Sequence, residues 1–331
     1  PFGCCQAQRA ATLRYAAVAG WRDRISRPRL EPLPSIVFHS TRRQFSTRLV
    51  LAASLIALSG CAGFGSKPTP APAPQAQKPK IGLALGGGAA RGFAHIGVIK
   101  MLESHGIYPD YVVGTSAGAV VGSLYAAGYD AFAMQKIAHQ LDEKIFADWT
   151  LGGRGLLKGE ALQDFINQHI NRRPLEQLNR RFATVATDLN SGERVVFRTG
   201  DTGMAVRASA AVPGVFQPTQ FRGHSYVDGG LTSPVPVLAA REMGADIVIA
   251  VDISAKPEGQ PTDSMTAIMW QTTTIMGGAI AANELKGADV VIRPRLPYVK
   301  SWDFTARNDA MLEGERAAQA ALVAIKQKMG R

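Results

Sequence analysis

Cysteine is scarce in this sequence, and the little that is present lies near one end. The chain has 331 residues and three cysteines, which are Cys4, Cys5 and Cys61. The region after Cys61 therefore can form no disulfide bond and cannot bind zinc through thiolate ligands. Long apolar runs are scarce as well. The stretch 50–58 is nearly all apolar, but about ten residues are too few to cross a bilayer, which takes about 20.

Acidic residues are rare in the first part of the chain, and this asymmetry accounts for most of the net charge of +11. Residues 1–61 hold nine Arg, no Lys and two acidic residues, which leaves a net charge of only +4 on residues 62–331. A nucleic-acid binder concentrates Lys and Arg along one face with aromatic stacking partners, and no such run follows residue 81. We therefore expect no nucleic-acid partner.

The sequence does contain enough apolar material for a folded core, since 46% of its residues are hydrophobic and 19% are charged. Short apolar segments alternate with longer amphipathic ones from residue 80 onward. This alternation predicts one α/β domain of about 250 residues, with a mainly parallel sheet, helices on both faces and active loops at the carboxyl ends of the strands. The predicted strands are 81–85, 111–113, 182–187, 194–197, 246–252 and 289–292, and the predicted helices are 117–127, 163–170, 234–243, 265–285 and 310–329.

Residues 41–61 contain the three parts of an export signal. Arg42 and Arg43 precede the apolar stretch, and small residues precede Cys61. The ending Leu-Ser-Gly-Cys resembles a bacterial lipobox, in which Cys61 would receive a diacylglyceryl group, become the new N-terminus and anchor the protein to a membrane. Residues 41–45 also resemble a twin-arginine export motif. The alternatives are a short buried helix with an incidental cysteine and an Arg-rich transit peptide.

This signal divides the chain into four predicted parts. Residues 1–40 contain no Met, and we expect them to be translated upstream sequence that is not native to the protein. Residues 41–61 are the signal, residues 62–80 are a Pro/Ala-rich tether that reaches about 50 Å as polyproline II, and residues 81–331 are the globular domain. The predicted location is the bacterial cell envelope. We prefer the outer membrane, facing the periplasm, because Ala62 gives no obvious inner-membrane retention signal.

Three glycine-framed loops follow predicted strands, and the first covers residues 86–92. Its glycines let backbone N–H groups point at a negative atom at the start of a helix. A dinucleotide-binding loop needs glycine at positions i, i+2 and i+5, but Arg91 stands at the third of these. A phosphate-binding P-loop fails too, because its Lys-Ser/Thr ending is missing. A purely structural turn stays an alternative for this loop taken alone.

The second loop, 114–118, reads Gly-Thr-Ser-Ala-Gly between a predicted strand and a predicted helix. This pattern is typical of a nucleophile elbow, in which small flanking residues allow a sharp turn that presents Ser116 at a helix N-terminus. The alternative is a serine that only caps the helix.

The third loop provides the candidate base. An α/β-hydrolase order of Ser, acid and His is excluded, because no histidine follows His224. Asp228 precedes two glycines, so its carboxylate can approach a partner closely and could accept the proton of Ser116 directly as a general base. A turn aspartate is the alternative. We expect His169 and His224 to be ordinary core or surface histidines.

Taken together, the three loops resemble the patatin-like phospholipase family from residue 80 to about residue 237. That family has a glycine-rich oxyanion loop ending in Arg/Lys-Gly, a Gly-x-Ser-x-Gly elbow and an Asp-Gly-Gly/Ala site in this order. The stretches 185–189 and 208–216 also resemble blocks of the family. The resemblance implies a three-layer α/β/α fold and a Ser-Asp dyad that hydrolyses acyl esters of phospholipids or lysophospholipids, without a metal or other cofactor.

Carried over residue by residue, the resemblance makes Ser116 the expected nucleophile and Asp228 its general base. The expected oxyanion donors are the N–H groups of Gly87 and Gly88, with Gly86 or Ala89 as further candidates, and each donor is worth about 10²–10³ in rate. We expect Arg91 to support the loop rather than to meet a lipid phosphate, and Asp188 to be structural. The other expected supporting residues are Gly92, Gly114, Gly118 and Gly229.

Two other functions stay open at this point. Acyl transfer to an acceptor other than water would use the same dyad. An inactive lipid-binding lipoprotein of the envelope is the second alternative, although an intact Ser116 and Asp228 would then have no purpose. The apolar stretch 265–270 either faces an acyl chain or, more simply, belongs to a helix packed on the sheet.

Overall fold

The computed structural model describes residues 78–141, 157–259, 262–299 and 303–330. Residues 1–40, the signal 41–61 with Cys61, and most of the tether 62–80 lie outside the described residues, so the export signal and the membrane anchor stay predictions. The structure therefore concerns the predicted globular domain.

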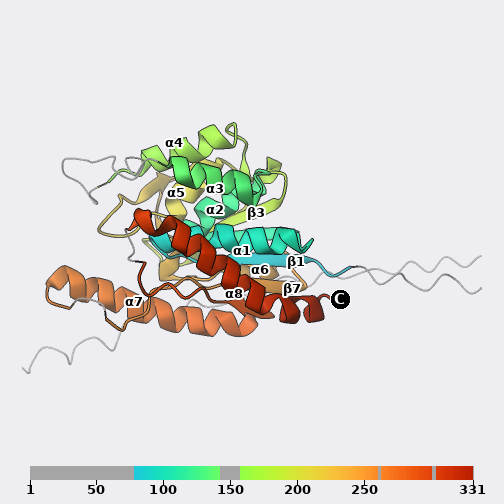
Figure 1. Ribbon diagram of the computed structural model, residues 1–331. Helices are drawn as coiled ribbons and strands as arrows, with labels where there is room; N and C mark the ends of the chain where they lie inside the picture. The colour runs from blue at the N-terminus through green and yellow to red at the C-terminus, as the bar shows by residue number, and fades with distance from the viewer. Residues whose placement is uncertain (1–77, 142–156, 260–261, 300–302, 331) are drawn as a thin grey trace, which may run out of the picture. The chain divides into compact units, whose positions relative to one another are not determined.

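A mixed sheet of eight strands forms the centre of this domain (Figure 1). The strands β3, β2, β1, β7 and β8 lie side by side in this order and run parallel, which confirms the predicted mainly parallel sheet. At one side β4 and β6 pair antiparallel with β3, and β5 pairs antiparallel with β6. The bounds are β1 (Ile81–Leu85), β2 (Tyr111–Thr115), β3 (Arg181–Asp188), β4 (Arg194–Phe197), β5 (Thr219–Phe221), β6 (His224–Asp228), β7 (Ile247–Val251) and β8 (Val290–Ile292).

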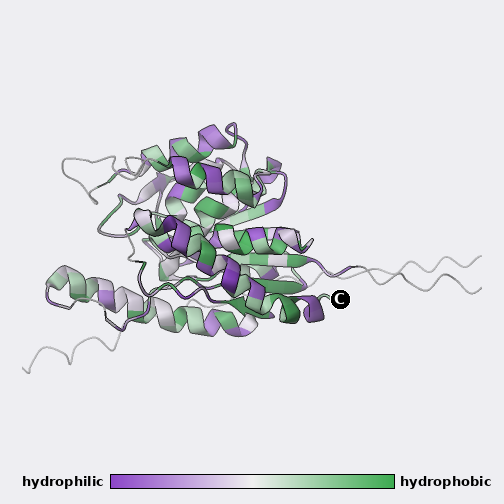
Figure 2. Ribbon diagram, viewed as in Figure 1, coloured by the Kyte–Doolittle hydropathy of each residue, from purple (hydrophilic) through white to green (hydrophobic). Residues whose placement is uncertain are grey.

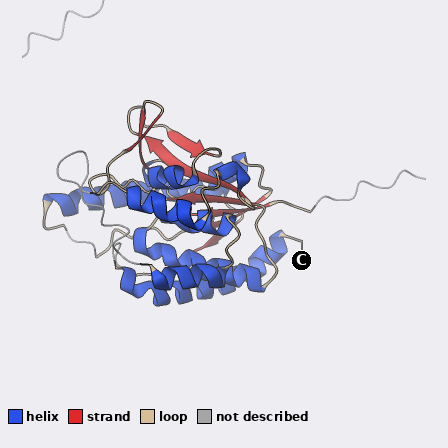
Figure 3. Cartoon of the chain, turned by 90° about the horizontal axis from the view of Figure 1, so that it is seen from above, coloured by secondary structure: helices blue, strands red, loops and turns tan. Residues whose placement is uncertain are grey.

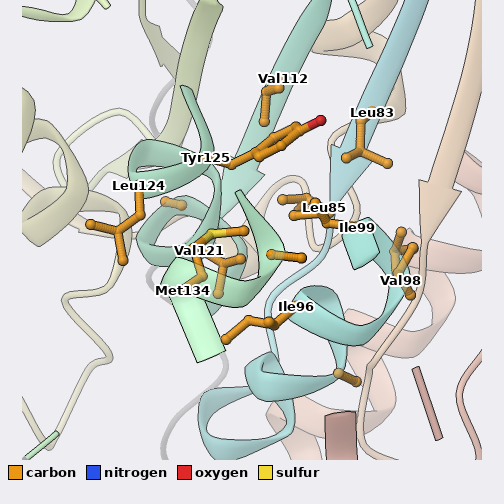
Figure 4. Packing of buried hydrophobic residues seen from close by; sticks show 14 of the residues in the cluster. Leu83, Leu85, Ile96, Val98, Ile99, Val112, Val121, Leu124, Tyr125 and Met134 are labelled. Carbon is orange, nitrogen blue, oxygen red and sulfur yellow. The ribbon is translucent and has the colours of Figure 1, made fainter. Parts of the chain in front are cut away.

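Helices cover both faces of the sheet, which confirms the expected α/β/α layers (Figure 3). Because side chains alternate along a strand, Leu83 and Leu85 pack with α1, α2 and α8, whereas Ala84 packs with α6 on the opposite face. Figure 4 shows Tyr125 of α2 among the side chains on the face of the sheet where Leu83 and Leu85 lie. The bounds are α1 (Phe93–Ser104), α2 (Ala117–Ala126), α3 (Ala131–Gln140), α4 (Glu160–His169), α5 (Thr202–Ser209), α6 (Val237–Glu242), α7 (Met265–Glu284) and α8 (Arg307–Lys328).

The six predicted strands are all present, but the sequence analysis missed β5 and β6 as well as α3 and α5. β6 begins with His224 and Ser225, so it lacks the apolar run that marked the central strands. The predicted helix 265–285 is present as α7, yet only Ala281 of that helix is buried. A helix packed along the sheet was therefore the wrong expectation for its first half. Among the helices of the described ranges, none combines the length and the hydropathy needed to cross a bilayer.

The sheet register brings the predicted loops together at one edge. β1 and β2 are parallel neighbours, so the glycine loop after Leu85 and the elbow after Thr115 leave the sheet side by side. Thr115 is level with Val185 of β3, and the next residue, Ala186, is level with Asp228 of β6. The antiparallel strand β6 thus ends level with the carboxyl end of β2, with only β3 between them. Strand order alone therefore places Ser116 and Asp228 near one another.

Candidate active site

Ser116 lies in a strained turn between β2 and α2. Its backbone angles are φ 54° and ψ −120°, a conformation that residues other than glycine rarely adopt. The turn is tight because its glycines touch backbone: a Cβ on Gly118 would lie 2.1 Å from the Leu85 carbonyl oxygen, and one on Gly114 would lie 2.3 Å from the Gly118 oxygen. The side chain is only 8% exposed. The geometry is that of the predicted nucleophile elbow.

A second serine holds this turn in place. The backbone N–H of Ser116 donates to Ser209 Oγ at 2.9 Å, and Ser209 Oγ in turn donates to the Val185 carbonyl oxygen at 2.5 Å. Ser209 is the last residue of α5 and is fully buried. The sequence analysis noted this serine only within a family-like block and gave it no role. Its contact with Ser116 spans 93 positions of sequence, so no local signal could have shown it.

Asp228 ends β6 and faces Ser116. Its Oδ1 accepts the Gly230 N–H at 2.7 Å, whereas Oδ2 is buried and has no hydrogen-bond partner in the described part of the chain. Burial raises the pKa of Asp228 from 3.8 to about 6, and the side chain of Ser116 and the Gly230 amide lower it in part. Ser116 and Asp228 line the same cavity. Catalytic hydrogen bonds are often long or poorly aligned without substrate, so the geometry suits a general base.

The glycine loop lies directly against the nucleophile, since a Cβ on Gly87 would be 3.3 Å from Ser116 Cβ. Two of the predicted donors are already in use: the Gly86 N–H donates to Val251 O at 3.0 Å, and the Gly87 N–H donates to Pro234 O at 2.9 Å. Because each N–H is a single donor, the expectation that these two bind an oxyanion is wrong for this conformation. The amides of Gly88 and Ala89, which have no partner among the described residues, are left for that role.

Two buried side chains support this loop. Arg91 is 8% exposed, its Nε donates to the Ile253 carbonyl oxygen at 2.9 Å, and burial lowers its pKa. This contact agrees with the predicted supporting role. His95 was not predicted: its Nε2 lies 2.8 Å from the Gly86 oxygen, and burial lowers its pKa to about 4. A carbonyl oxygen only accepts, so Nε2 carries the hydrogen and the imidazole is neutral near pH 7.

Two cavities meet at Ser116. The smaller one measures about 100 Å³ and is almost wholly apolar, and its lining includes Ala117, Val120, Val121, Leu162, Val212 and Phe216. The larger one measures about 500 Å³, and its lining includes Gly88, Arg91, Asp228, Met269, Trp270 and Thr274. One side of α7 thus forms a wall of the larger cavity. Ser116 therefore borders one cavity that is almost wholly apolar and one cavity whose lining includes charged residues.

Other candidate residues lie elsewhere. His224 Nδ1 is 2.6 Å from Asp188 Oδ2, and His169 Nδ1 is 2.8 Å from the Phe165 carbonyl oxygen. The amides of Asn190 and Ser191 also donate to Asp188 and hold its pKa below the ordinary value. None of these three residues lines either cavity, so a structural Asp188 and two ordinary histidines stay predictions that fit these contacts. No group of three or more possible metal ligands occurs within the described residues.

Comparisons with known proteins concern the family of this chain. Residues 83–241 match the family model described as Patatin-like phospholipase. An uncharacterized NTE family protein of Mycobacterium tuberculosis (strain ATCC 25618 / H37Rv) is 38% identical over 188 residues, which are 56% of this chain and 52% of that protein. Lysophospholipase NTE1 of Yarrowia lipolytica is 31% identical over 232 residues, which are 67% of this chain and 16% of that protein.

The chain thus spans about half the length of the mycobacterial relative and a much smaller share of the yeast one. Among solved structures, VipD from Legionella pneumophila covers 75% of this chain and 67% of its own, with 13% sequence identity and a TM-score of 0.43. The matched residues 83–241 include the glycine loop, the elbow and Asp228 in the family order. This chain belongs to the patatin-like phospholipase family.

Proposed function

We propose that this protein is a lipid ester hydrolase in which Ser116 attacks the ester carbonyl and Asp228 acts as the general base. One observation carries the proposal. Ser116, on its strained elbow, shares the larger cavity with Gly88 and Ala89, whose amides are unused among the described residues, and with the unpartnered Oδ2 of Asp228. These are the three groups that acyl transfer through a serine requires.

The proposed reaction has two halves. Asp228 takes the Ser116 proton as Oγ bonds to the carbonyl carbon, and the amides of Gly88 and Ala89 donate to the developing oxyanion. Asp228 then gives its proton to the leaving alcohol, and the acyl-enzyme remains. In the second half Asp228 removes a proton from water, which attacks the acyl-enzyme and releases the fatty acid. Burial keeps the pKa of Asp228 at about 6, so near neutral pH it can both accept and return a proton.

We propose phospholipids or lysophospholipids as the substrate class. The family description and the name of the yeast relative support this choice. Besides its supporting bond to Ile253, Arg91 lines the larger cavity, and it takes part in none of the ion pairs found among the described residues. A buried cation of this kind suits a substrate that carries a phosphate.

The test is labelling with a fluorophosphonate probe, together with hydrolysis of 4-nitrophenyl butyrate. Wild type should react, and Ser116→Ala should abolish labelling and lower kcat by a factor of about 10⁶. Ser123→Ala is the matched control: this buried serine lies on the same helix, donates only to the Val120 carbonyl oxygen and should leave both signals intact. A folded wild-type protein that neither labels nor hydrolyses would contradict the proposal and favour an inactive lipid-binding protein.

A further inference from the structure

The two cavities at Ser116 differ in their relation to the general base. Ser116 and Ala89 line both of them, so both open onto the nucleophile and the oxyanion loop. Asp228 and Arg91 line only the larger cavity. Among the described residues, no charged side chain lines the smaller one. The general base therefore stands on one side of the nucleophile, and the apolar cavity opens on the other.

The path of the proton decides which cavity takes which half of the ester. Asp228 receives the proton of Ser116 Oγ as the Oγ–carbon bond forms. When the bond from the carbonyl carbon to the ester oxygen breaks, the same carboxyl group must return this proton to the leaving oxygen. The leaving alcohol must therefore lie beside Asp228, in the larger cavity. The acyl chain, attached to the opposite side of the carbonyl carbon, then points away from Asp228.

On this basis, which rests on the proposed function, we infer that the smaller cavity is the acyl-chain site and that the larger cavity receives the alcohol half of the substrate. The lining agrees with this assignment, because a hydrocarbon chain needs no polar partner and the cavity offers almost none. Arg91 lies in the larger cavity, where the phosphate of a phospholipid alcohol half would be. Because α7 lines the larger cavity, it lies beside the alcohol half of the substrate and not beside the acyl chain.

The volume of the smaller cavity also indicates how many carbons of an acyl chain it can hold. A cavity of about 150 Å³ holds one benzene molecule, so about 100 Å³ accommodates roughly the first four carbons of a chain. The cavity is not fully enclosed, so carbons beyond the fourth would extend out of it. Each methylene buried there should raise kcat/KM by about fourfold, up to about four carbons.

Val120 is the residue with which to test the site. It stands four positions after Ser116 on α2, hence on the same helix face as the nucleophile, and it is only partly buried. Val120→Phe should fill the cavity, and Val120→Ala should widen it. Thr274→Phe is the matched control, because Thr274 lines only the larger cavity and the same ring would be added on the opposite side.

The substrates are 4-nitrophenyl acetate, butyrate and octanoate, which share one leaving group. For wild type, kcat/KM should rise about 15-fold from acetate to butyrate. Val120→Phe should lose most of this rise and leave the acetate value within about threefold, whereas Val120→Ala should shift the preference toward octanoate. Thr274→Phe should lower all three values by a common factor.

The outcomes separate the two proposals. Wild type that hydrolyses none of the esters would contradict the proposed function itself. Active wild type with a chain-length preference that changes in Thr274→Phe, and not in the Val120 variants, would overturn the acyl-site assignment. If Val120→Phe does not fold, the smaller Val120→Ala decides alone, and an unchanged preference in that variant contradicts the inference.

Discussion

Two parts of the active site differ in how deeply their side chains are buried: the floor, formed by Ser116, Arg91 and Asp228, and the wall, formed by one side of α7. On the floor, Ser116, Arg91 and Asp228 are each at most 8% exposed, and each takes part in a hydrogen bond that holds it in place. On the wall, Met265 is 82% exposed and Met269 is 62% exposed. The outer side of α7 is largely apolar and uncharged, whereas α8 carries charged residues outside (Figure 2). Apolar composition alone therefore does not show which helix belongs to the core.

The difference also concerns how each region is fixed. The elbow and the glycine loop tolerate no added atom, since a Cβ on Gly118 would overlap the Leu85 carbonyl group. α7 is fixed near its end, where Glu284 accepts from Ser233 Oγ at 2.7 Å and burial raises its pKa to about 6. The floor needs exact positions for proton transfer, whereas the wall only bounds a space. Substitutions on the floor should therefore have much larger effects than substitutions on the wall.

The largest effect in this comparison is expected for Asp228→Asn, which keeps the shape of the floor and removes the base. We expect kcat/KM for 4-nitrophenyl butyrate to fall about 10²–10⁴-fold. In wild type the carboxylate form is the active one, and burial raises the pKa of Asp228 to about 6. Wild-type kcat/KM should therefore rise with pH up to about 6 and then level off. A pH profile without this rise would exclude Asp228 as the base.

The same substitution should stabilise the fold at high pH. The pKa of Asp228 is raised from 3.8 to about 6, so the folded state binds the proton more tightly than the unfolded state does. Wild type therefore loses stability as the pH rises from about 4 to about 6, by about 3 kcal/mol in full. Asp228→Asn should exceed wild type by about this amount at pH 8 and by almost nothing at pH 3.5. Urea unfolding at both pH values measures the difference.

A smaller effect is expected for Ser209→Ala, which leaves the Ser116 N–H without its acceptor. The elbow should shift slightly, and kcat should fall about 10- to 100-fold while KM changes little, because Ser209 lines neither cavity. The free energy of unfolding should fall by about 1–3 kcal/mol. If the protein loses stability but keeps its kcat, Ser209 serves the fold and not the position of the nucleophile.

Much of the floor could be predicted from the sequence because its chemistry is local. The elbow has a signature within a few residues that predicts Ser116 as the nucleophile, whereas Asp228 became the predicted base only when the three loops were taken together as a family resemblance. The free amides could not be predicted in the same way. Whether Gly86 and Gly87 can donate depends on Val251 and Pro234, which are far away in sequence. Contacts of this range follow from the strand order and not from the loop itself.

The wall was predicted less well, for a different physical reason. Residues 265–284 contain a single charged residue and many apolar ones, and this composition normally indicates a buried helix. The helix itself was predicted correctly, but its surroundings were not. Which sides of such a helix are buried depends on the elements that pack against it. Only Ala281 of α7 is buried, so few of the described residues pack against this helix.

The smallest effects are therefore expected on α7, and a pair of methionines can test this. Met276 on α7 is 59% exposed and lines neither cavity, whereas Met311 on α8 is 4% exposed. Met276→Gln should change the free energy of unfolding by less than about 0.5 kcal/mol and leave kcat/KM for the butyrate ester within about twofold. Met311→Gln makes the same chemical change within the core and should cost about 2–5 kcal/mol. Equal losses in both variants would mean that the outer face of α7 is covered in solution, and the contrast between wall and floor would no longer hold.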